Sequence, residues 1–330
     1  MKERIPQLDG LRAVAVIGVF LVHATSIRLV WIGVDLFFVL SGFLITGILI
    51  QSKDRSFGSY IRGFYARRVR RILPAYVAIL VVTTLLFGTA WMVDWYFYVG
   101  GMNLLRPLGR DLGPPNIRSL WSLAVEEQFY LLWPIVVFFL DGKQIIRCAI
   151  LLLALAPFLR LVCTPLFPDD HWVIYSQLPF RMDTLAAGAL VALIKDRLSR
   201  RNMITAATLV LFAGLTGIYW LGAHGLSSAS NTKVSNVLVY EATLFVVTGM
   251  FVLALVGVGK SVLSFAPIRW LGIISYSVYL FHVTAIDLSR GRIWVSVLII
   301  LAYAVPMWFL VERPILNFKK VRAVPHPISP

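Results

Sequence analysis

Apolar runs of about 20 residues, the length of helix that crosses a hydrocarbon core about 30 Å thick, recur along the whole chain. Backbone polar groups need internal partners in lipid, so a chain with many such runs folds as a closed bundle of helices. The pattern predicts an all-α polytopic membrane protein, a bundle of about ten transmembrane helices. The predicted spans are residues 10–27, 33–51, 73–92, 121–140, 146–163, 179–195, 203–222, 237–257, 268–286 and 294–311.

The composition agrees with a membrane protein, because only 14% of the residues are charged, against about 25% in soluble domains. The net charge of +15 would suit a nucleic-acid binder, but most of the 31 Lys and Arg residues lie on one side of the predicted bundle. Cytoplasmic loops of membrane proteins carry this excess. Both termini and the loops 52–72, 141–145, 196–202 and 258–267 are therefore expected in the cytoplasm, and no nucleic-acid partner is expected.

The chain is expected to form a single integral-membrane domain over residues 1–330, with a core at 8–314 and a cytoplasmic tail at 315–330. Two Pro-containing outer loops, 93–120 and 164–178, are expected to cover the outer mouth of the bundle. The sequence shows neither an internal repeat nor a low-complexity tract.

The first predicted span, "LDGLRAVAVIGVFLVHA", carries Arg12 and His23, two residues that are costly in lipid. Their spacing places both side chains on one face of a helix, about 16 Å apart along its axis. Two interpretations stay open at this point. Arg12 extends to the cytoplasmic interface while His23 lies at the outer one, or the two form a polar stripe facing a passage through the bundle.

Further polar residues fall inside other predicted spans, several of them at the depth of His23. A single buried polar residue is usually a hydrogen-bonded structural one, whereas several at similar depth predict a polar chamber that opens outward. These residues are Asp35 and Ser41 in the second span, Glu126 and Glu127 in the fourth, Arg181 and Asp183 in the sixth, and His282 in the ninth.

An arginine cluster, "FYARRVRRILPAY", precedes the third predicted span on the cytoplasmic side. It is either a topology anchor that also binds anionic lipid or a phosphate site. Arginine rather than lysine favours the second interpretation, because guanidinium forks bind phosphate through two parallel hydrogen bonds. Arg68 and Arg71 share a helical face and are expected to clamp a polyphosphate ligand together.

Seven stretches, taken in order, resemble the integral-membrane acyltransferase 3 family over residues 8–314. They are "LDGLRAVAVIGVFLVHA", "GVDLFFVLSGFLI", "RRVRRILP", "SLAVEEQFYLLWP", "FRMDTLAAGAL", "ISYSVYLFH" and "VERP". The resemblance implies a ten-helix bundle in the bacterial cytoplasmic (inner) membrane. It implies transfer of an acyl group, usually acetyl, from cytoplasmic acyl-CoA to a hydroxyl of a surface or exported glycan, such as the O-antigen of lipopolysaccharide or an exopolysaccharide.

The resemblance also implies roles for particular residues. His23 matches the essential histidine of the family and is expected to act as the base. Glu126 matches its glutamate and is expected to orient that imidazole. Arg12, Arg68 and Arg71 match its arginines and are expected to bind the acyl-CoA co-substrate, the last two at the CoA phosphates. Expected substrate-binding residues are Asp35, Ser41, Glu127, Tyr130, Arg181, Asp183 and His282.

Acetyl-CoA is expected as a co-substrate, without a permanently bound cofactor or metal. Expected partners are acyl-CoA, a glycan or lipid-linked glycan acceptor, membrane lipids and, as an open alternative, polysaccharide-assembly proteins. Two-domain relatives carry an esterase-like domain that residues after 314 are not expected to form. A secondary transporter is the main alternative, but it would show an internal two-fold repeat. A subunit that only organises an export complex leaves the buried charges without a role.

Overall fold

The computed structural model describes residues 5–25, 31–89, 101–110 and 116–317. Within these ranges the secondary structure is helical, which confirms the predicted all-α membrane class. Part of the outer loop expected at 93–120 and most of the tail expected at 315–330 lie outside the described residues. The helices are α1 (Pro6–Ala24), α2 (Gly33–Gln51), α3 (Phe57–Phe87), α4 (Trp121–Phe139), α5 (Gly142–Cys163), α6 (His171–Ser176), α7 (Met182–Ile194), α8 (Arg200–Ala223), α9 (Lys233–Leu255), α10 (Lys260–Leu263), α11 (Ala266–Leu288), α12 (Ile293–Pro306) and α13 (Arg313–Asn317).

Nine helices in the described ranges are long and apolar enough to cross a membrane, and they correspond to nine of the ten predicted spans. The sixth predicted span differs, because α7 has only 13 residues. That is about 20 Å of helix, less than the hydrocarbon thickness. Nine of the 13 residues of α7 are buried and none is exposed, and the helix packs against α2, α5 and α9. Since protein surrounds α7, its length does not have to match the bilayer.

The third helix is longer than the predicted span at 73–92. It begins at Phe57 and runs for 31 residues through Pro74. Most of the segment expected as the loop 52–72 is therefore helical and carries the arginine cluster. A helix points neighbouring arginines in different directions, so only some members of the cluster can face the inside of the bundle.

A capping box fixes where α5 begins. The carboxylate of Asp141 accepts hydrogen bonds from the backbone N–H groups of Gln144 (2.9 Å) and Lys143 (2.8 Å), and the Gln144 side chain bonds back to the Asp141 N–H. These bonds, that from Gln144 first, lower the pKa of Asp141. The capping box thus fixes the start of α5 directly after the short connection from α4.

Glycines bring helix backbones into direct contact at two crossings. A Cβ atom on Gly42 of α2 would lie 1.9 Å from the carbonyl oxygen of Leu185 in α7, and one on Gly188 would lie 2.0 Å from that of Val39. A Cβ atom on Gly272 of α11 would lie 1.7 Å from the carbonyl oxygen of Asp9 in α1. Small residues permit such close helix packing in membranes. These crossings fix α7 against α2, and α11 along α1.

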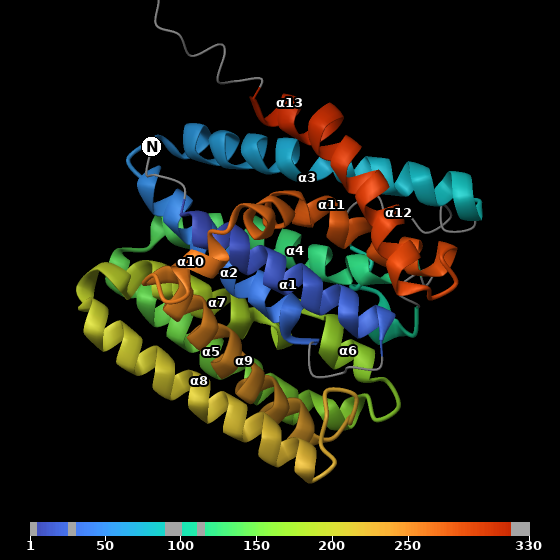
Figure 1. Cartoon of the computed structure of the whole chain (residues 1–330). Helices are drawn as coiled ribbons and strands as arrows, with labels where there is room; N and C mark the ends of the chain where they lie inside the picture. Colours follow the sequence, from blue (N-terminus) through green and yellow to red (C-terminus); the bar gives the residue numbers. More distant parts are fainter. Residues whose placement is uncertain (1–4, 26–30, 90–100, 111–115, 318–330) are drawn as a thin grey trace, which may run out of the picture.

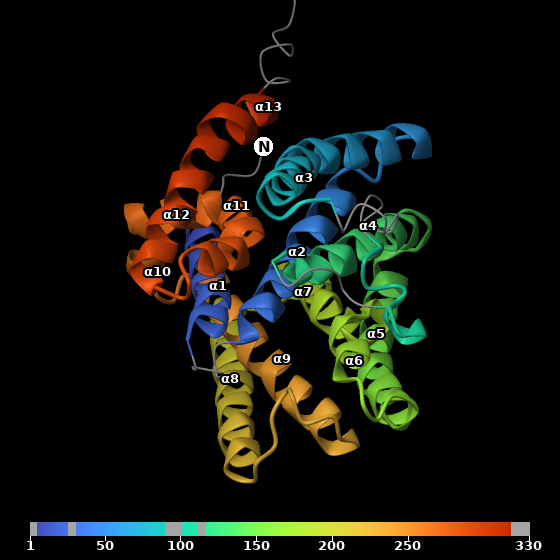
Figure 2. The same cartoon turned by 90° about the vertical axis from the view of Figure 1, so that its right-hand side faces the viewer.

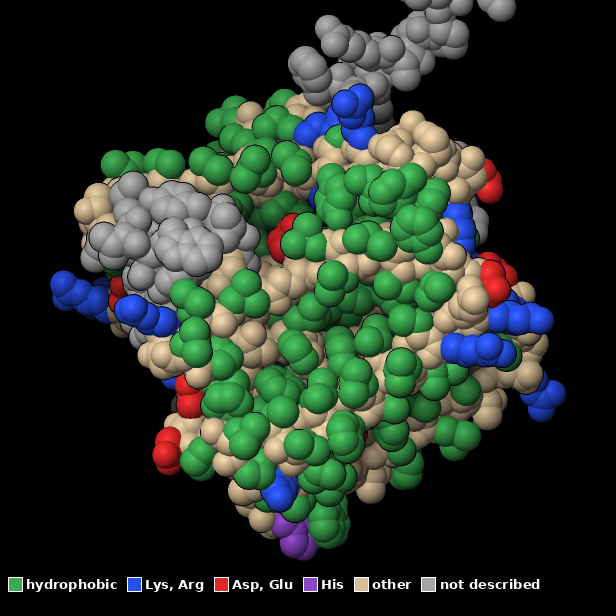
Figure 3. All heavy atoms as spheres, turned by 180° about the vertical axis from the view of Figure 1, so that it is seen from behind, with side chains coloured by type: hydrophobic (Ala, Val, Ile, Leu, Met, Phe, Trp, Pro, Cys, Tyr) green, Lys and Arg blue, Asp and Glu red, His purple; other side chains and the backbone are tan. Residues whose placement is uncertain are grey.

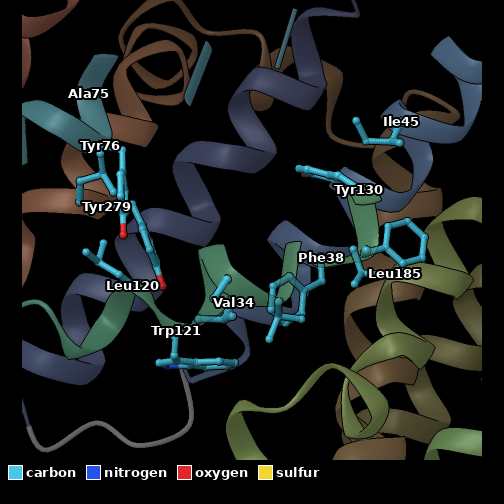
Figure 4. Packing of buried hydrophobic residues seen from close by; sticks show 14 of the residues in the cluster. Val34, Phe38, Ile45, Ala75, Tyr76, Leu120, Trp121, Tyr130, Leu185 and Tyr279 are labelled. Carbon is cyan, nitrogen blue, oxygen red and sulfur yellow. The ribbon is translucent and has the colours of Figure 1, made fainter. Parts of the chain in front are cut away.

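The helices lie roughly side by side, with α1, α2 and α7 in the middle of the bundle (Figures 1 and 2). Helix α3 lies along one side and α8 along the opposite side in both views. A large buried apolar cluster joins α1, α2, α3, α4 and α11. Its residues include Val34 and Phe38 of α2, which in Figure 4 lie between Tyr279 of α11 and Tyr130 of α4.

The surface carries a wide belt of hydrophobic side chains, with Lys and Arg gathered along one edge (Figure 3). We call this edge the basic end, where α2, α4, α7 and α9 finish and α3, α5, α8 and α11 begin. An apolar belt bounded by basic residues is the surface expected of a bundle embedded in a bilayer. The basic end carries Lys53, Arg55, Lys143, Arg147, Lys195, Arg197, Arg200, Arg201, Lys260 and Arg269.

At the opposite end, the described part of the outer loops packs onto α6. The side-chain amide of Asn103 donates to the carbonyl oxygen of Ser176 (2.6 Å) and accepts from Gln128 (2.8 Å). Arg106 forms an ion pair with Asp170 at 2.7 Å. These contacts tie residues 101–110 to α4 and α6.

Candidate active site

A pocket of about 290 Å³ lies between α1, α2, α3, α4 and α11. Its wall is mostly apolar, but it also carries three guanidinium groups and a carboxylate. Charged groups that line a cavity within a membrane bundle usually mark a ligand site. The lining includes six residues predicted from the sequence, Arg12, Ser41, Arg68, Arg71, Glu126 and Tyr130.

The Glu126 carboxylate is held from two sides. The hydroxyl of Ser41 donates to Oε1 at 2.8 Å, and the hydroxyl of Tyr130 donates to Oε2 at 2.9 Å. The guanidinium carbon of Arg68 lies 5.2 Å from the centre of the Tyr130 ring, within the range of a cation–π contact. A continuous polar path thus runs from an arginine of α3 to a carboxylate of α4.

Helix α3 divides the arginine cluster between two faces. Arg68 and Arg71 line the pocket and are half-buried, as their shared face predicts. Arg67 is exposed, and Nε of Arg70 donates to the backbone carbonyl oxygen of Ala66 at 2.9 Å. The pocket therefore receives two of the four arginines, spaced one helical turn apart.

His23 and His282 meet beyond the pocket, at the end of α1. Nδ1 of His23 lies 3.3 Å from Nε2 of His282, and the ring centres are 4.9 Å apart. His282 follows Tyr279, a pocket-lining residue, by one turn of α11, and these two rings are 5.5 Å apart. His23 is exposed, whereas His282 is fully buried. The histidine pair therefore stands behind the pocket wall formed by Tyr279.

The partner expected for His23 is not the one found in the structure. The polar contacts of Glu126 go to Ser41 and Tyr130, and those of His23 go to Val19 and His282. The sequence indicated similar depth for the two residues but not which helices are neighbours. Helix α11 packs along α1, which brings His282 rather than Glu126 to the histidine.

Three residues predicted to bind substrate belong to a separate buried charge cluster. Arg181 forms an ion pair with Asp35 at 2.5 Å, and Arg160 forms one with Asp183 at 2.7 Å and with Glu241 at 2.6 Å. Arg160, Arg181, Asp35 and Asp183 are all buried, and they neutralise one another between α2, α5, α7 and α9. They lie outside the pocket lining. Rings of Phe38, Trp121, Tyr175 and Tyr240 surround the Arg181 guanidinium at 4.9 to 6.0 Å.

Glu127 points away from Glu126, as its position one residue later on a helix predicts. It is half-buried and does not line the pocket.

Sequence reasoning missed part of the site. Ser122 and Tyr279 line the pocket and are hydrogen-bonded to each other, and the Tyr279 hydroxyl also bonds to the carbonyl oxygen of Ser119 at 2.8 Å. Both residues lie in stretches already singled out, "SLWSLAVEEQFYLLWP" and "ISYSVYLFH". Glu241 was also missed, although an acidic residue inside an apolar span is itself a signal of a buried partner.

The described residues thus form a polytopic helical membrane protein with a pocket that carries three arginines and a carboxylate. Residues 5–311 match the model of the acyltransferase domain family. The chain belongs to this family of membrane acyltransferases.

The chain spans about half the length of the curated relatives that it matches. It is 32% identical to the putative peptidoglycan O-acetyltransferase YrhL of Bacillus subtilis, over 86% of this chain and 49% of that protein. It is 29% identical to the peptidoglycan O-acetyltransferase OatA of Listeria monocytogenes, over 90% of this chain and 53% of that protein. It is 27% identical to the O-acetyltransferase OatA of Staphylococcus aureus, over 84% of this chain and 50% of that protein. No solved structure matches the chain.

Proposed function

We propose that the protein takes an acetyl group from acetyl-CoA on the cytoplasmic side of the bacterial inner membrane. It transfers this group to a hydroxyl of an exported or surface glycan on the other side. The observation that carries this proposal is the pocket, in which Arg12, Arg68 and Arg71 share a cavity with Glu126 inside an acyltransferase-family bundle. The names of the relatives, which are O-acetyltransferases, support the same chemistry.

The donor enters the pocket from the basic end in this proposal. Arg68 and Arg71 bind its phosphates, since guanidinium groups form bidentate hydrogen bonds with phosphate oxygens. The apolar wall, which includes Val34, Phe37 and Phe38, receives the flexible arm that carries the thioester. The reactive end then approaches Tyr279 and the histidine pair.

His23 acts as the base in the transfer. Its imidazole accepts the proton of the acceptor hydroxyl while the hydroxyl oxygen bonds to the acyl carbon. The C–S bond of the thioester breaks, and the proton passes from the imidazole to the CoA sulfur. A route through acetyl-His23 uses the same residue and the same overall balance of bonds.

The acceptor is a glycan in this proposal, with peptidoglycan, O-antigen and exopolysaccharide as the candidate classes. Peptidoglycan is what the printed names of two relatives specify. Mass spectrometry of each surface glycan from cells with and without the protein identifies the acceptor by the loss of an acetyl increment. Unchanged acetylation of every class would remove the glycan from the proposal.

A matched pair of double variants tests the donor site. We expect Arg68→Ala/Arg71→Ala to lose most acetyl transfer from labelled acetyl-CoA in proteoliposomes, mainly through a KM for acetyl-CoA raised at least about tenfold. Arg67→Ala/Arg70→Ala removes the same charge from the same helix, but from positions outside the pocket. It should keep wild-type KM.

His23→Ala supplies the inactive reference in this assay, with a loss of at least about 100-fold in kcat for a missing base. Each variant must first be shown to insert into the membrane and to elute from a size-exclusion column at the same volume as the wild type. Equal KM values for the two double variants would reduce the cluster to a topology signal and contradict the donor site.

A further inference from the structure

The histidine pair consists of an exposed imidazole backed by a buried one. Nδ1 of His23 lies 2.8 Å from the carbonyl oxygen of Val19 and 3.3 Å from Nε2 of His282. Nδ1 of His282 lies 2.6 Å from the carbonyl oxygen of Tyr279. The two rings meet edge to face, with an interplanar angle of 71°.

These contacts assign the protons on both rings. A carbonyl oxygen only accepts hydrogen bonds, so Nδ1 of His23 and Nδ1 of His282 each carry a hydrogen. In the neutral ring of His282 the proton at Nδ1 leaves a lone pair on Nε2, and that lone pair faces the Nδ1–H of His23. The Nδ1–H of His23 is thus shared between two acceptors, and its Nε2 keeps a lone pair for an incoming hydroxyl.

His224 shows what the helix alone provides. It lies directly after α8, is exposed, and places Nδ1 2.8 Å from the carbonyl oxygen of Trp220, four residues earlier. His23 has the same contact with Val19, also four residues earlier. The carbonyl contact is therefore local. His224 packs in addition on the ring of Trp220, with 4.2 Å between the ring centres, whereas His23 has a second nitrogen contact, with His282.

We propose that His282 is a positioning residue for His23, acting through Nε2 as a hydrogen-bond acceptor. This role rests on the function proposed above. His282 holds the ring of His23 with Nε2 toward the exposed side. When His23 takes the acceptor proton, the Nδ1–H of the resulting imidazolium becomes a stronger donor, and the lone pair of His282 stabilises it.

Because His282 is buried, it is suited to act as a neutral hydrogen-bond acceptor for His23. Its ring is fully buried, against the ring of Tyr279, and a charge there would be costly to desolvate. It therefore remains a neutral acceptor while the proton moves between the hydroxyl, Nε2 of His23 and the CoA sulfur. A buried carboxylate has the corresponding role in Ser-His-Asp sites.

Substitutions of His282 separate its hydrogen bond from its bulk. His282→Phe keeps a ring but removes the acceptor, and should lower kcat at least about tenfold with KM for acetyl-CoA within about twofold, because His282 does not line the pocket. His282→Gln offers an amide oxygen near the position of Nε2 and should keep most of the rate. His224→Phe is the control and should leave both constants unchanged.

A chemical probe reports on His23 without acetyl transfer. Diethyl pyrocarbonate modifies neutral imidazoles, and peptide mass spectrometry gives a rate for each histidine. We expect His23 to react faster than His224 in the wild type. Both residues donate from Nδ1 to a carbonyl oxygen, but Nδ1–H of His23 has a second acceptor in Nε2 of His282, which makes Nε2 of His23 more nucleophilic. In His282→Phe the rate at His23 should fall to that of His224, and His282→Gln should restore it.

The two readouts keep this role and the proposed function apart. An unchanged rate of modification at His23 in His282→Phe, with kcat retained, would overturn the role of His282. Loss of kcat in both variants with unchanged modification would also overturn it. A wild type without acetyl transfer, but with His23 reactivity that depends on His282, would overturn the proposed function and support the pair. If His282→Phe does not fold, His282→Gln and His282→Leu provide the same comparison.

Discussion

Charged side chains inside the bundle occur in two arrangements. Arg181 with Asp35 and Arg160 with Asp183 form close ion pairs with almost fully buried partners. Arg68 and Arg71 instead line a cavity, which leaves donors for a ligand. A buried ion pair recovers its desolvation cost only through close partners. We therefore assign the paired groups to holding helices together, and the pocket-lining groups to binding.

A double-variant cycle tests this division at Asp35 and Arg181. Asp35→Leu and Arg181→Met each leave an unpaired buried charge and should lower the free energy of unfolding by about 3–5 kcal/mol. The double variant Asp35→Leu/Arg181→Met removes both charges and should recover most of that loss. Thermal unfolding of the purified proteins in detergent gives the comparison. Single variants that melt as the wild type does, but lose transfer, would return both residues to the substrate-binding role predicted from the sequence.

Sequence periodicity predicts which residues share a face, and it succeeds where one helix decides the outcome. Arg68 and Arg71 face the pocket together, and Tyr130 reaches Glu126 from one turn away. Periodicity does not predict which residues of different helices contact each other. The sequence indicates the depth of His23 and Glu126 but not the packing of α11 along α1, so the pairing with His282 required the structure.

Hydropathy predicts nine of the spans because each of those helices carries an apolar stretch long enough to cross a membrane, whether its side chains face the surface or the interior of the bundle. It fails in length for α7, which is enclosed by protein and ends after 13 residues, and it misses the first turns of α3, where arginines lower the mean hydropathy of a continuous helix. Close crossings are also invisible to hydropathy. Their signal is glycine within an apolar run, as at Gly42 and Gly188.

Two glycines of α2 allow a matched test of the α2–α7 crossing. Gly42→Ala places a Cβ atom 1.9 Å from the carbonyl oxygen of Leu185, a backbone atom that cannot rotate away, whereas Gly47→Ala meets nothing within 4 Å. We expect Gly42→Ala to destabilise the protein by about 1–3 kcal/mol or more. Gly47→Ala should be neutral or slightly stabilising, because alanine favours helix. The test compares the melting temperatures of the two variants in detergent. Equal melting temperatures for Gly42→Ala and Gly47→Ala would show that the helices pack less closely at this crossing than the backbone distances imply.

At the scale of the whole molecule, the chain separates two chemical environments along the bundle. Arg68 and Arg71 of the pocket lie in the first half of α3, which begins at the basic end, and the histidine pair lies towards the other end, where α1 finishes. Tyr279 and its hydrogen-bond partner Ser122 stand between them. In the function that we propose, the donor reaches these residues from the basic end and the acceptor from the opposite end.

This arrangement has a consequence for topology in cells. The positive-inside rule predicts that the basic end faces the cytoplasm. Single cysteines at the exposed positions Lys143 and Arg201 should therefore react with a membrane-impermeant maleimide only after permeabilisation. Cysteines at the exposed positions Asp169 and Ala229, at the opposite end, should react in intact cells.

The test needs a background without the two native cysteines, Cys148 and Cys163, both free and partly buried. Their replacement by alanine removes competing labelling, and retained acetylation by that background shows that the fold is intact. If Lys143→Cys were labelled in intact cells, the basic end would face outward. Arg68 and Arg71 would then lie on the side away from the cytoplasmic acyl-CoA. The donor site proposed here would then have no donor, whatever the activity of the arginine variants, because CoA thioesters do not cross a bilayer unaided.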